Sequence, residues 1–403
     1  MLVGVLTFCG LNLMVSTALR PVRRYSYRLF FIIHLVLGIA MPLMILFHAA
    51  PAKAFLLEAL GVFFLDLVSR KMDTVTGNAT LETIPGTNLI KISASIPQSK
   101  VNRFRAHPGS HIYLSLPAAA RKAMSATSIS HLLFEFLFNP FTVAAVDEET
   151  GDLTLVARHS GGPMTAALGR LAGAAKPNRS TTNSTTTDED KIPLSIEGPY
   201  GAAARFPHLC TDFDRILLVA GGVGATFTLP LYRSIASENP AAKVEMVWAI
   251  RSAGDATWAV TGKEAQALLK DNNLQMFVTG DMLTPEGPGR GSSRQAAGAR
   301  RTNGAAQGTG AATGTAAAGE DEGEVELSAM YRDRRRGRYT AQHNRKRPDL
   351  KKAVDDLFKH GQEERVAVLV CGPKEMAREV REHVGVWVKK GRAVWYHREG
   401  FGF

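Results

Sequence analysis

The feature that most constrains this chain is an uncharged apolar stretch close to its N-terminus. Residues 29–50 carry no charged side chain, and an α-helix needs about 20 such residues to cross the hydrocarbon core of a bilayer. A second run, residues 2–19, has nearly the same length, whereas residues 54–68 are fewer and include Glu58 and Asp66. The sequence therefore predicts two transmembrane helices and a weaker third.

Basic residues flank these apolar runs and predict their orientation. Four arginines crowd residues 20–28, and Arg70 and Lys71 follow the third run. Positively charged loops stay on the cytoplasmic side of a membrane. We therefore expect residues 1–72 to form a multi-pass membrane segment, with residues 50–53 outside and the rest of the chain in the cytosol.

The composition agrees with a cytosolic remainder. The chain has three cysteines, Cys9, Cys210 and Cys371. They are too few and too scattered for a disulfide framework and are typical of a reducing compartment. The formal net charge is +11, but part of that excess lies in low-complexity stretches and no nucleic-acid-binding motif accompanies it. A nucleic-acid partner is therefore not expected.

Two kinds of pattern follow the membrane segment. Over about residues 75–205, short runs such as LIKISASI, HIYLSL and LTLVAR are separated by Gly, Pro or charged turns, which predicts an antiparallel β-barrel or sandwich. Over about residues 210–403, buried-type strands such as RILLVA and RVAVLVCG alternate with helical segments. That alternation predicts a doubly wound α/β domain with a parallel sheet.

Two stretches interrupt these patterns, at about residues 170–190 and 284–340. Both are rich in Gly, Ala, Ser, Thr and Arg. Segments of this composition bury too little apolar surface to order themselves, so we expect two disordered insertions, one in each domain.

A glycine-rich turn joins the first strand of the α/β domain to its helix. In LLVAGGVGATF, Gly221, Gly222 and Gly224 stand between the two elements. Glycines there let the backbone approach a pyrophosphate, and the helix N-terminus offers N–H groups to it. Phe227 replaces the third glycine of the G-x-G-x-x-G pattern, so a plain tight turn is the alternative.

Two further strand ends of this domain carry candidate residues. Arg251 follows the second strand, where an arginine pairs with a ribose 2′-phosphate. Arg251 therefore favours NADPH over NADH as the bound nucleotide. The alternative is that Arg251 is a solvated arginine with no role in binding. A late strand ends in Cys371, Gly372 and Pro373, at the edge where open α/β sheets bind ligands. The aromatic C-terminus adds Phe401 or Phe403, either of which could lie over a planar cofactor ring.

The barrel region has two motifs of its own. One is Asn139, Pro140, Phe141 and Thr142, and the other is a Gly-rich turn with Gly161, Gly162 and Thr165. A Gly-rich turn with a threonine hydroxyl suits a second pyrophosphate. Ordinary β-turns are the alternative for both.

These motifs, in this order, resemble the ferric-chelate reductase/NADPH oxidase family, whose soluble half is similar to ferredoxin–NADP reductase. The resemblance rests on HPGSHIYL, NPFTV, GGPMT, IEGPYG, VAGGVGATFTLPL, VCGP and a terminal H-x-E-x-F-x-F. It covers the chain outside the two low-complexity stretches. It implies transmembrane helices, then an antiparallel β-barrel that binds FAD, then a doubly wound α/β domain that binds NADPH.

The resemblance also implies roles for residues at the matching positions. Asn139, Pro140, Phe141 and Thr142 would contact the flavin, Gly162 and Thr165 the FAD phosphates, and Gly221, Gly222, Gly224 and Thr226 the NADPH phosphates. Cys371, Gly372 and Pro373 would face the nicotinamide, and Phe403 would lie near the isoalloxazine, so Cys371 and Phe403 are the candidate catalytic residues. Many members of the family have histidine at the position of Asn139.

Two histidines, His34 and His48, stand in the apolar stretch of residues 29–50. A helix turns about 100° and rises about 1.5 Å per residue, so they share one face roughly 21 Å apart. Imidazoles in lipid are functional candidates and bind haem iron, with structural histidines as the alternative. In the resembled family this spacing binds two haems, each completed by a histidine of another helix. Residues 1–100 contain no other histidine, so we expect a truncated sequence or a short paralogue.

The resemblance implies a transmembrane ferric-chelate reductase of the plasma membrane. It would move electrons from cytosolic NADPH through FAD and haem to an extracellular ferric or cupric chelate. One alternative is an NADPH oxidase that reduces O₂ to superoxide. Another is a haem-less chain that acts as a membrane-tethered flavin diaphorase or as a non-catalytic partner subunit. Besides lipid, the expected partner is a second copy of the chain or a full-length reductase.

Overall fold

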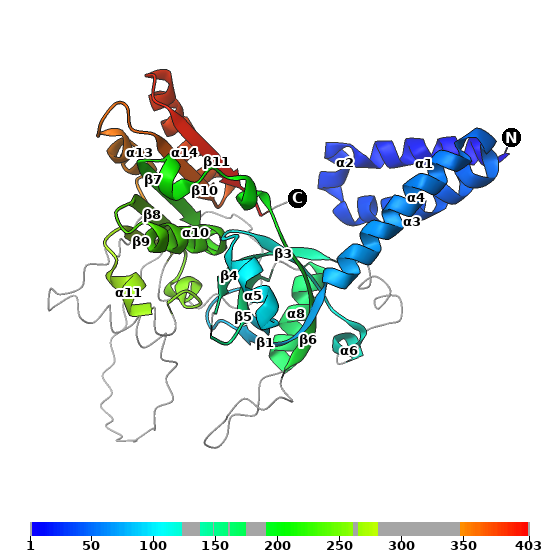
Figure 1. Ribbon diagram of the computed structural model, residues 1–403, viewed down its shortest axis with the longest axis horizontal. Coiled ribbons are helices and arrows are strands. Elements are labelled where there is room, and N and C mark those ends of the chain that lie inside the picture. The colour runs from blue at the N-terminus through cyan, green and yellow to red at the C-terminus, as the bar shows by residue number, and fades with distance from the viewer. Residues whose placement is uncertain are drawn as a thin grey trace, which may run out of the picture. The chain divides into compact units, whose positions relative to one another are not determined.

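The computed structural model describes residues 2–122, 138–147, 149–159, 162–174, 191–260, 265–280 and 347–401 (Figure 1). The chain divides into two compact units, Met1–Thr74 and Val75–Phe403. Phe403 and the predicted insertion at 284–340 lie outside the described residues, as do residues 175–190 of the other predicted insertion.

The N-terminal unit is helical. Its elements are α1 (Leu2–Ala18), α2 (Arg20–Tyr25), α3 (Tyr27–His48), the 3₁₀ turn η1 (Ala50–Ala52) and α4 (Lys53–Asp73). The Ser26 hydroxyl caps α3 by accepting a hydrogen bond from the Leu29 N–H at 3.2 Å. Of the described helices, only the stretch Leu29–His48 is long and apolar enough to cross a membrane, and α1 is apolar but shorter. One helix therefore meets the criteria, where the sequence predicted two or three.

The second unit begins with a closed antiparallel barrel. Its strands are β1 (Val75–Thr83), β2 (Leu89–Ser95), β3 (His111–Ser115), β4 (Asn139–Val146), β5 (Asp152–Arg158) and β6 (Ile192–Tyr200), in the order β1-β2-β5-β4-β3-β6. Helices α5 (Gln98–Arg105), α6 (Ala118–Lys122) and α8 (Pro163–Ala174) accompany it. Alternate residues such as Ile92, Ile112 and Leu155 fill the interior, because successive side chains of a strand point to opposite faces.

A five-stranded parallel sheet follows the barrel. Its strands are β7 (Arg215–Gly221), β8 (Lys243–Ile250), β9 (Leu274–Val278), β10 (Val366–Cys371) and β11 (Val394–Glu399), in the order β11-β10-β7-β8-β9. α10 (Ala225–Glu238) packs on one face, and α13 (Leu350–Phe358) and α14 (Lys374–Lys389) pack on the other. Shorter elements are η3 (Ala202–Arg205), α9 (Leu209–Asp212), η4 (Gly222–Gly224), η5 (Ala253–Ala256) and α11 (Ala265–Lys270). The strand order reverses between β7 and β10, so the predicted doubly wound fold is confirmed.

The barrel and the parallel sheet share one apolar cluster, with α10 between them (Figure 1). Ala144 and Val156 of the barrel belong to the same cluster as Phe227 and Leu231 of α10. Gly109, in the loop before β3, has φ +79°, and a Cβ there would lie 3.1 Å from the Phe227 ring. Glycine therefore meets two demands at this position, a left-handed backbone and close contact with α10.

Two strands were not predicted, and one prediction of disorder was wrong. β1 (VTGNATLET) lacks a clear strand pattern, but it pairs with both β2 and β6, and a Cβ on Gly77 would collide with the Ser95 carbonyl oxygen. β11 was not singled out as a strand, and it is the edge strand beside β10. Residues 170–174 of the first predicted insertion form the end of α8, where Leu171 and Ala172 are buried.

The core of the sheet yields a stability prediction. Val370, on β10, is fully buried, and Val386, on α14, is 49% exposed. Val370→Ala should lower the free energy of unfolding by on the order of 2 kcal/mol, since it removes buried methyl groups and leaves a cavity. Val386→Ala, the matched control, should change it by less than about 0.5 kcal/mol. The midpoint of urea denaturation measures both, and equal effects would contradict the placement of β10.

Candidate active site at the carboxyl edge of the sheet

The glycine-rich turn lies where β7 and β10 end side by side. A Cβ on Gly224 would collide with the Cys371 carbonyl oxygen, and one on Gly221 would lie 2.5 Å from the Pro373 ring. Gly222 has φ +55°, a conformation that favours glycine. The three glycines therefore let two strand ends approach each other directly at the topological switch point, where open α/β sheets bind ligands.

Two hydrogen bonds hold this turn in shape. The indole N–H of Trp248, which is fully buried on β8, donates to the Gly222 carbonyl at 3.0 Å. The Thr226 hydroxyl donates to the Val223 carbonyl at 2.9 Å, and Thr226 is only 1% exposed. Thr226 was expected to contact a phosphate, but its hydroxyl is buried and already bonded, so it shapes the turn instead. The N–H of Ala225, the first residue of α10, already donates to the Gly222 and Val223 carbonyls. The N–H groups left for an anion are those at the start of η4, which no side chain caps.

Cys371 ends β10 directly behind the turn. It is 1% exposed, and its Sγ lies 3.3 Å from where a Cβ on Gly224 would stand. Burial, and to a smaller degree the negative charge of Glu399, raises the pKa of Cys371 far above that of a free thiol. Cys371 therefore remains a neutral thiol at physiological pH.

Glu399, at the end of β11, lies opposite Cys371 in the sheet. The Nε2 of His397 lies 3.1 Å from its Oε2. The His397 ring packs among Phe206, Phe227 and Trp395, at centroid distances of 4.5, 5.8 and 6.0 Å. These three aromatic rings hold the His397 imidazole, and with it the Glu399 carboxylate, beside the carboxyl edge of the sheet that carries Cys371.

Glu399 also links the sheet to the barrel. Burial lowers the pKa of His111, on β3, while the charge of Glu399 opposes that shift. The residue opposite His111 on β4 is Thr142. The carboxyl edge of the sheet and the outer face of β3–β4 are thus within electrostatic reach of one another.

The candidate flavin residues on β4 separate into two groups. Asn139, Pro140 and Thr142 are partly exposed, whereas Phe141 is 9% exposed and packs in the barrel interior. The expected flavin contact through the Phe141 ring is therefore not supported, because its side chain points to the opposite face. The Oδ1 atom of Asn139 is buried and has no hydrogen-bond partner among the described residues.

Aromatic residues from two other strands surround this outer face. Tyr113 pairs with Pro140 across β3 and β4, and its ring lies 5.7 Å from His111 and 5.5 Å from Tyr200. The Tyr200 hydroxyl donates to the buried Glu197 carboxylate at 2.7 Å. Pro140 and Thr142 lie opposite Tyr113 and His111, on the same face as these rings. Flat rings suit stacking on a planar heterocycle, so this face fits FAD.

The second predicted phosphate motif lies at the start of α8. Among the described residues, a Cβ on Gly162 would meet only the Thr165 hydroxyl, at 3.7 Å. Thr165 is 9% exposed and donates to the Gly162 carbonyl at 3.2 Å. Gly161 lies outside the described residues. Arg158, at the end of β5, brings a guanidinium nitrogen to 3.9 Å from where a Cβ on Gly222 would stand. A cation from the barrel therefore reaches the glycine turn of the sheet, a contact that the sequence did not reveal.

Arg251 stands at the predicted strand end. It directly follows β8 and is exposed, and its backbone N–H donates to Asp255 at 3.0 Å. Asp255 and Ser252 also form a capping box at η5, which fixes the backbone there. The guanidinium is left at the carboxyl edge of the sheet, one strand from the glycine turn.

The two histidines of α3 have different surroundings. The Nδ1 of His34 lies 2.9 Å from the Phe30 carbonyl oxygen, which leaves Nε2 as the free ring nitrogen. The ring of His48 packs on α1, where a Cβ on Gly4 would lie 2.5 Å from its Nε2. Among the described residues no group of three or more His, Cys, Asp or Glu side chains is placed to hold a metal ion.

Comparison with known proteins agrees with this division of the chain. Residues 74–204 match the FAD-binding domain family, and residues 213–385 match the ferric reductase NAD binding domain family. A FAD-binding barrel followed by a nicotinamide-nucleotide domain defines the class of flavin-dependent oxidoreductases. The chain therefore carries an FAD-binding domain followed by a ferric reductase NAD binding domain.

Curated relatives are similar over this part of the chain. The probable metalloreductase AIM14 of Candida dubliniensis is 31% identical over 63% of this chain and 41% of its own length. That of Meyerozyma guilliermondii is 22% identical over 72% of this chain and 51% of its own. The chain thus spans about two fifths to half of these relatives. A Neisseria gonorrhoeae ferredoxin NADP⁺ reductase solved with bound FAD and NADP is 12% identical over 81% of this chain and 98% of its own, with a TM-score of 0.41, too low to support a functional conclusion.

The glycine turn yields a binding prediction. Gly224→Ala should weaken the binding of NADP⁺ at least about tenfold, because the new methyl group must push the turn away from β10. Gly173→Ala, on α8, is the control, since a Cβ there meets nothing within 4 Å. Equilibrium titration measures both dissociation constants. Unchanged binding by a folded Gly224→Ala variant would show that the nucleotide binds elsewhere.

Proposed function

We propose that this chain is an NADPH-dependent metalloreductase that moves electrons from cytosolic NADPH through FAD toward a ferric or cupric chelate across a membrane. The observation that carries this proposal is the meeting of Gly224 and Cys371 at the switch point of the sheet, within reach of the barrel face that fits FAD. The curated relatives are named probable metalloreductases, and α3 contains the candidate membrane span.

The chain's own residues would position the reactants. Bound NADPH and FAD would supply the hydride and electron chemistry. Gly221, Gly222 and Gly224 give a pyrophosphate access to backbone N–H groups, and Arg158 adds a positive charge there. Buried Cys371 closes the edge behind this turn with a neutral thiol. Residues that position the reactants in this way accelerate the reaction by holding the reacting groups in a productive geometry.

The described residues do not complete a haem site. His34 retains one free ring nitrogen, but His48 is packed against Gly4. This observation favours a second candidate function, a membrane-tethered flavin diaphorase that passes electrons to a soluble acceptor. Reduction of O₂ to superoxide is the other alternative, and the acceptor decides between them.

The proposal predicts a flavoprotein with diaphorase activity. The full chain, purified in a mild detergent, should retain or take up FAD and should oxidise NADPH with ferricyanide as acceptor. The reason is that both nucleotide sites lie within Val75–Phe403. Two measurements test this: the flavin absorbance of the purified protein, and the loss of that absorbance when NADPH is added in the absence of air. A folded protein that shows no flavin absorbance, even after FAD is added, would refute the proposal.

Arg251 predicts the choice of nucleotide. Arg251→Ala should weaken NADPH binding by about 1–3 kcal/mol, the range for a charge-assisted hydrogen bond, and leave NADH binding nearly unchanged. Arg365→Ala, an exposed arginine at the opposite edge of the sheet that pairs with Asp214, is the control. Dissociation constants for both nucleotides give the answer, and equal losses for the two would refute the assignment.

A further inference from the structure

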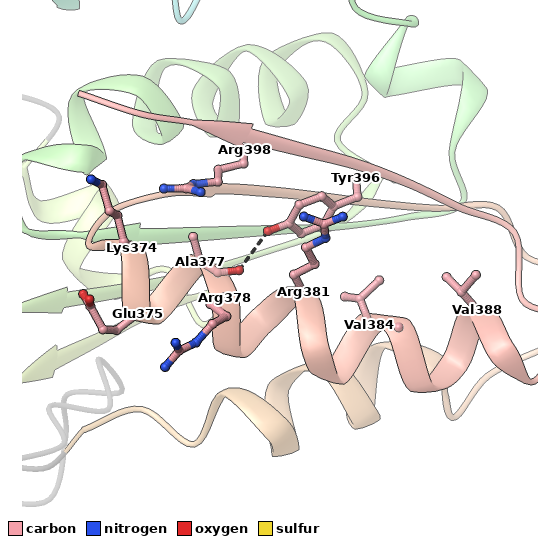
Figure 2. Close-up of a pocket in the computed structure, with 10 residues that line it drawn as sticks. Lys374, Glu375, Ala377, Arg378, Arg381, Val384, Val388, Tyr396 and Arg398 are labelled. Carbon is pink, nitrogen blue, oxygen red and sulfur yellow. Dashed lines mark hydrogen bonds between the residues drawn. The ribbon is translucent and has the colours of Figure 1, made fainter. Parts of the chain in front are cut away.

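A cavity lies between α14 and β11, on the face of the parallel sheet that α14 covers (Figure 2). Its volume is about 760 Å³, within the size range of small-molecule sites. Tyr396 and Arg398 of β11 line it, whereas Trp395 and His397, which alternate with them, pack against Phe206 on the opposite face. The sheet therefore separates this cavity from the aromatic rings around His397.

One end of the cavity is strongly cationic. Its charged lining is Lys374, Arg378, Arg381, Arg398 and a single acid, Glu375. In the view of Figure 2, Lys374, Arg381 and Arg398 project over the space between α14 and β11, and Glu375 and Arg378 point away from it. Arg378 has an ion-pair partner in Glu382 at 3.7 Å. Within the described part of the chain, the other three cations form no ion pair.

Tyr396 lines the cationic end of the cavity. Its hydroxyl donates to the Ala377 carbonyl at 3.0 Å, which ties β11 to the first turn of α14. Burial raises the pKa of Tyr396, and the positive charges of Arg398 and Arg381 oppose that shift. Both guanidinium groups therefore act on the same side chain, and an anion placed over Tyr396 would meet both of them.

The other end of the cavity is apolar. Val384, Gly385 and Val388 line it along the later turns of α14, and Val388 is 50% exposed. Lys374 and Val388 are fourteen residues apart on one helix, which corresponds to roughly 21 Å. The lining thus passes from cations to aliphatic side chains along one groove.

We propose that this groove binds an anionic amphiphile, a molecule with a phosphate or carboxylate head and an aliphatic tail. The head would lie among Lys374, Arg381 and Arg398, and the tail would lie over Val384 and Val388. A free inorganic anion would use only the cationic end. A folded protein partner needs about 800 Å² on each side, more than a groove of this length offers.

The test uses the full chain in phosphatidylcholine nanodiscs and decyl phosphate as the probe. Hydrogen exchange of the backbone amides is the readout. Decyl phosphate should slow exchange in residues 374–388 and 394–398. Inorganic phosphate, which lacks the tail, and decyltrimethylammonium, which reverses the head charge, should not.

Charge variants locate the head group. Arg381→Gln with Arg398→Gln should weaken the protection about tenfold, the loss expected for two exposed charges. Lysine at both positions should restore it. Arg205→Gln with Arg365→Gln, two exposed arginines outside the groove, is the matched control and should leave it unchanged. All four arginines are exposed, so the variants should fold.

Three outcomes would overturn the proposal. Equal protection by inorganic phosphate would assign a simple anion site. Protection by oligoglutamate but not by decyl phosphate would assign the groove to an acidic polypeptide. Protection by decyl phosphate that survives both glutamine substitutions would place the amphiphile elsewhere.

Discussion

The structure depends on one close approach of backbone to backbone, between Gly224 at the start of α10 and Cys371 at the end of β10. Parallel strands are about 4.8 Å apart, and the turn after β7 crosses directly over the end of its neighbour. A Cβ on Gly224 would collide with the Cys371 carbonyl oxygen. Because Gly224 has no side chain, the turn η4 before α10 fits at the carboxyl edge of the sheet, where its N–H groups can meet a phosphate.

The apolar cluster around α10 extends this arrangement to the barrel. Phe227 and Leu231 pack against the barrel through the close contact at Gly109. The same helix therefore carries the glycine turn at its start and supports β4 with its side. The barrel face that fits FAD and the turn that fits a nicotinamide nucleotide are thus fixed by one element, which explains how Arg158 of the barrel reaches Gly222.

Periodicity and turn residues predicted the barrel, the parallel sheet and the carboxyl-edge motifs, because these are local properties of the chain. They did not predict β1, which pairs with the distant β6 as well as with its neighbour β2, or β11, which pairs with β10 across a helix. Trp248, Arg158 and Glu399 were missed for the same reason, since each acts through a contact with a residue far along the chain. For Phe141 and Thr226 the motifs predicted a cofactor contact, whereas the strand register and a local hydrogen bond turn these two side chains inward.

The central claim is that the nicotinamide nucleotide binds at the switch point between β7 and β10. The most direct measurement is an experimental structure of the full chain with FAD and NADP⁺. We expect the NADP⁺ pyrophosphate to accept hydrogen bonds from backbone N–H groups between Gly222 and Thr226, with the nicotinamide beside Cys371. A pyrophosphate bound away from the glycine turn, with that turn unoccupied, would contradict this assignment.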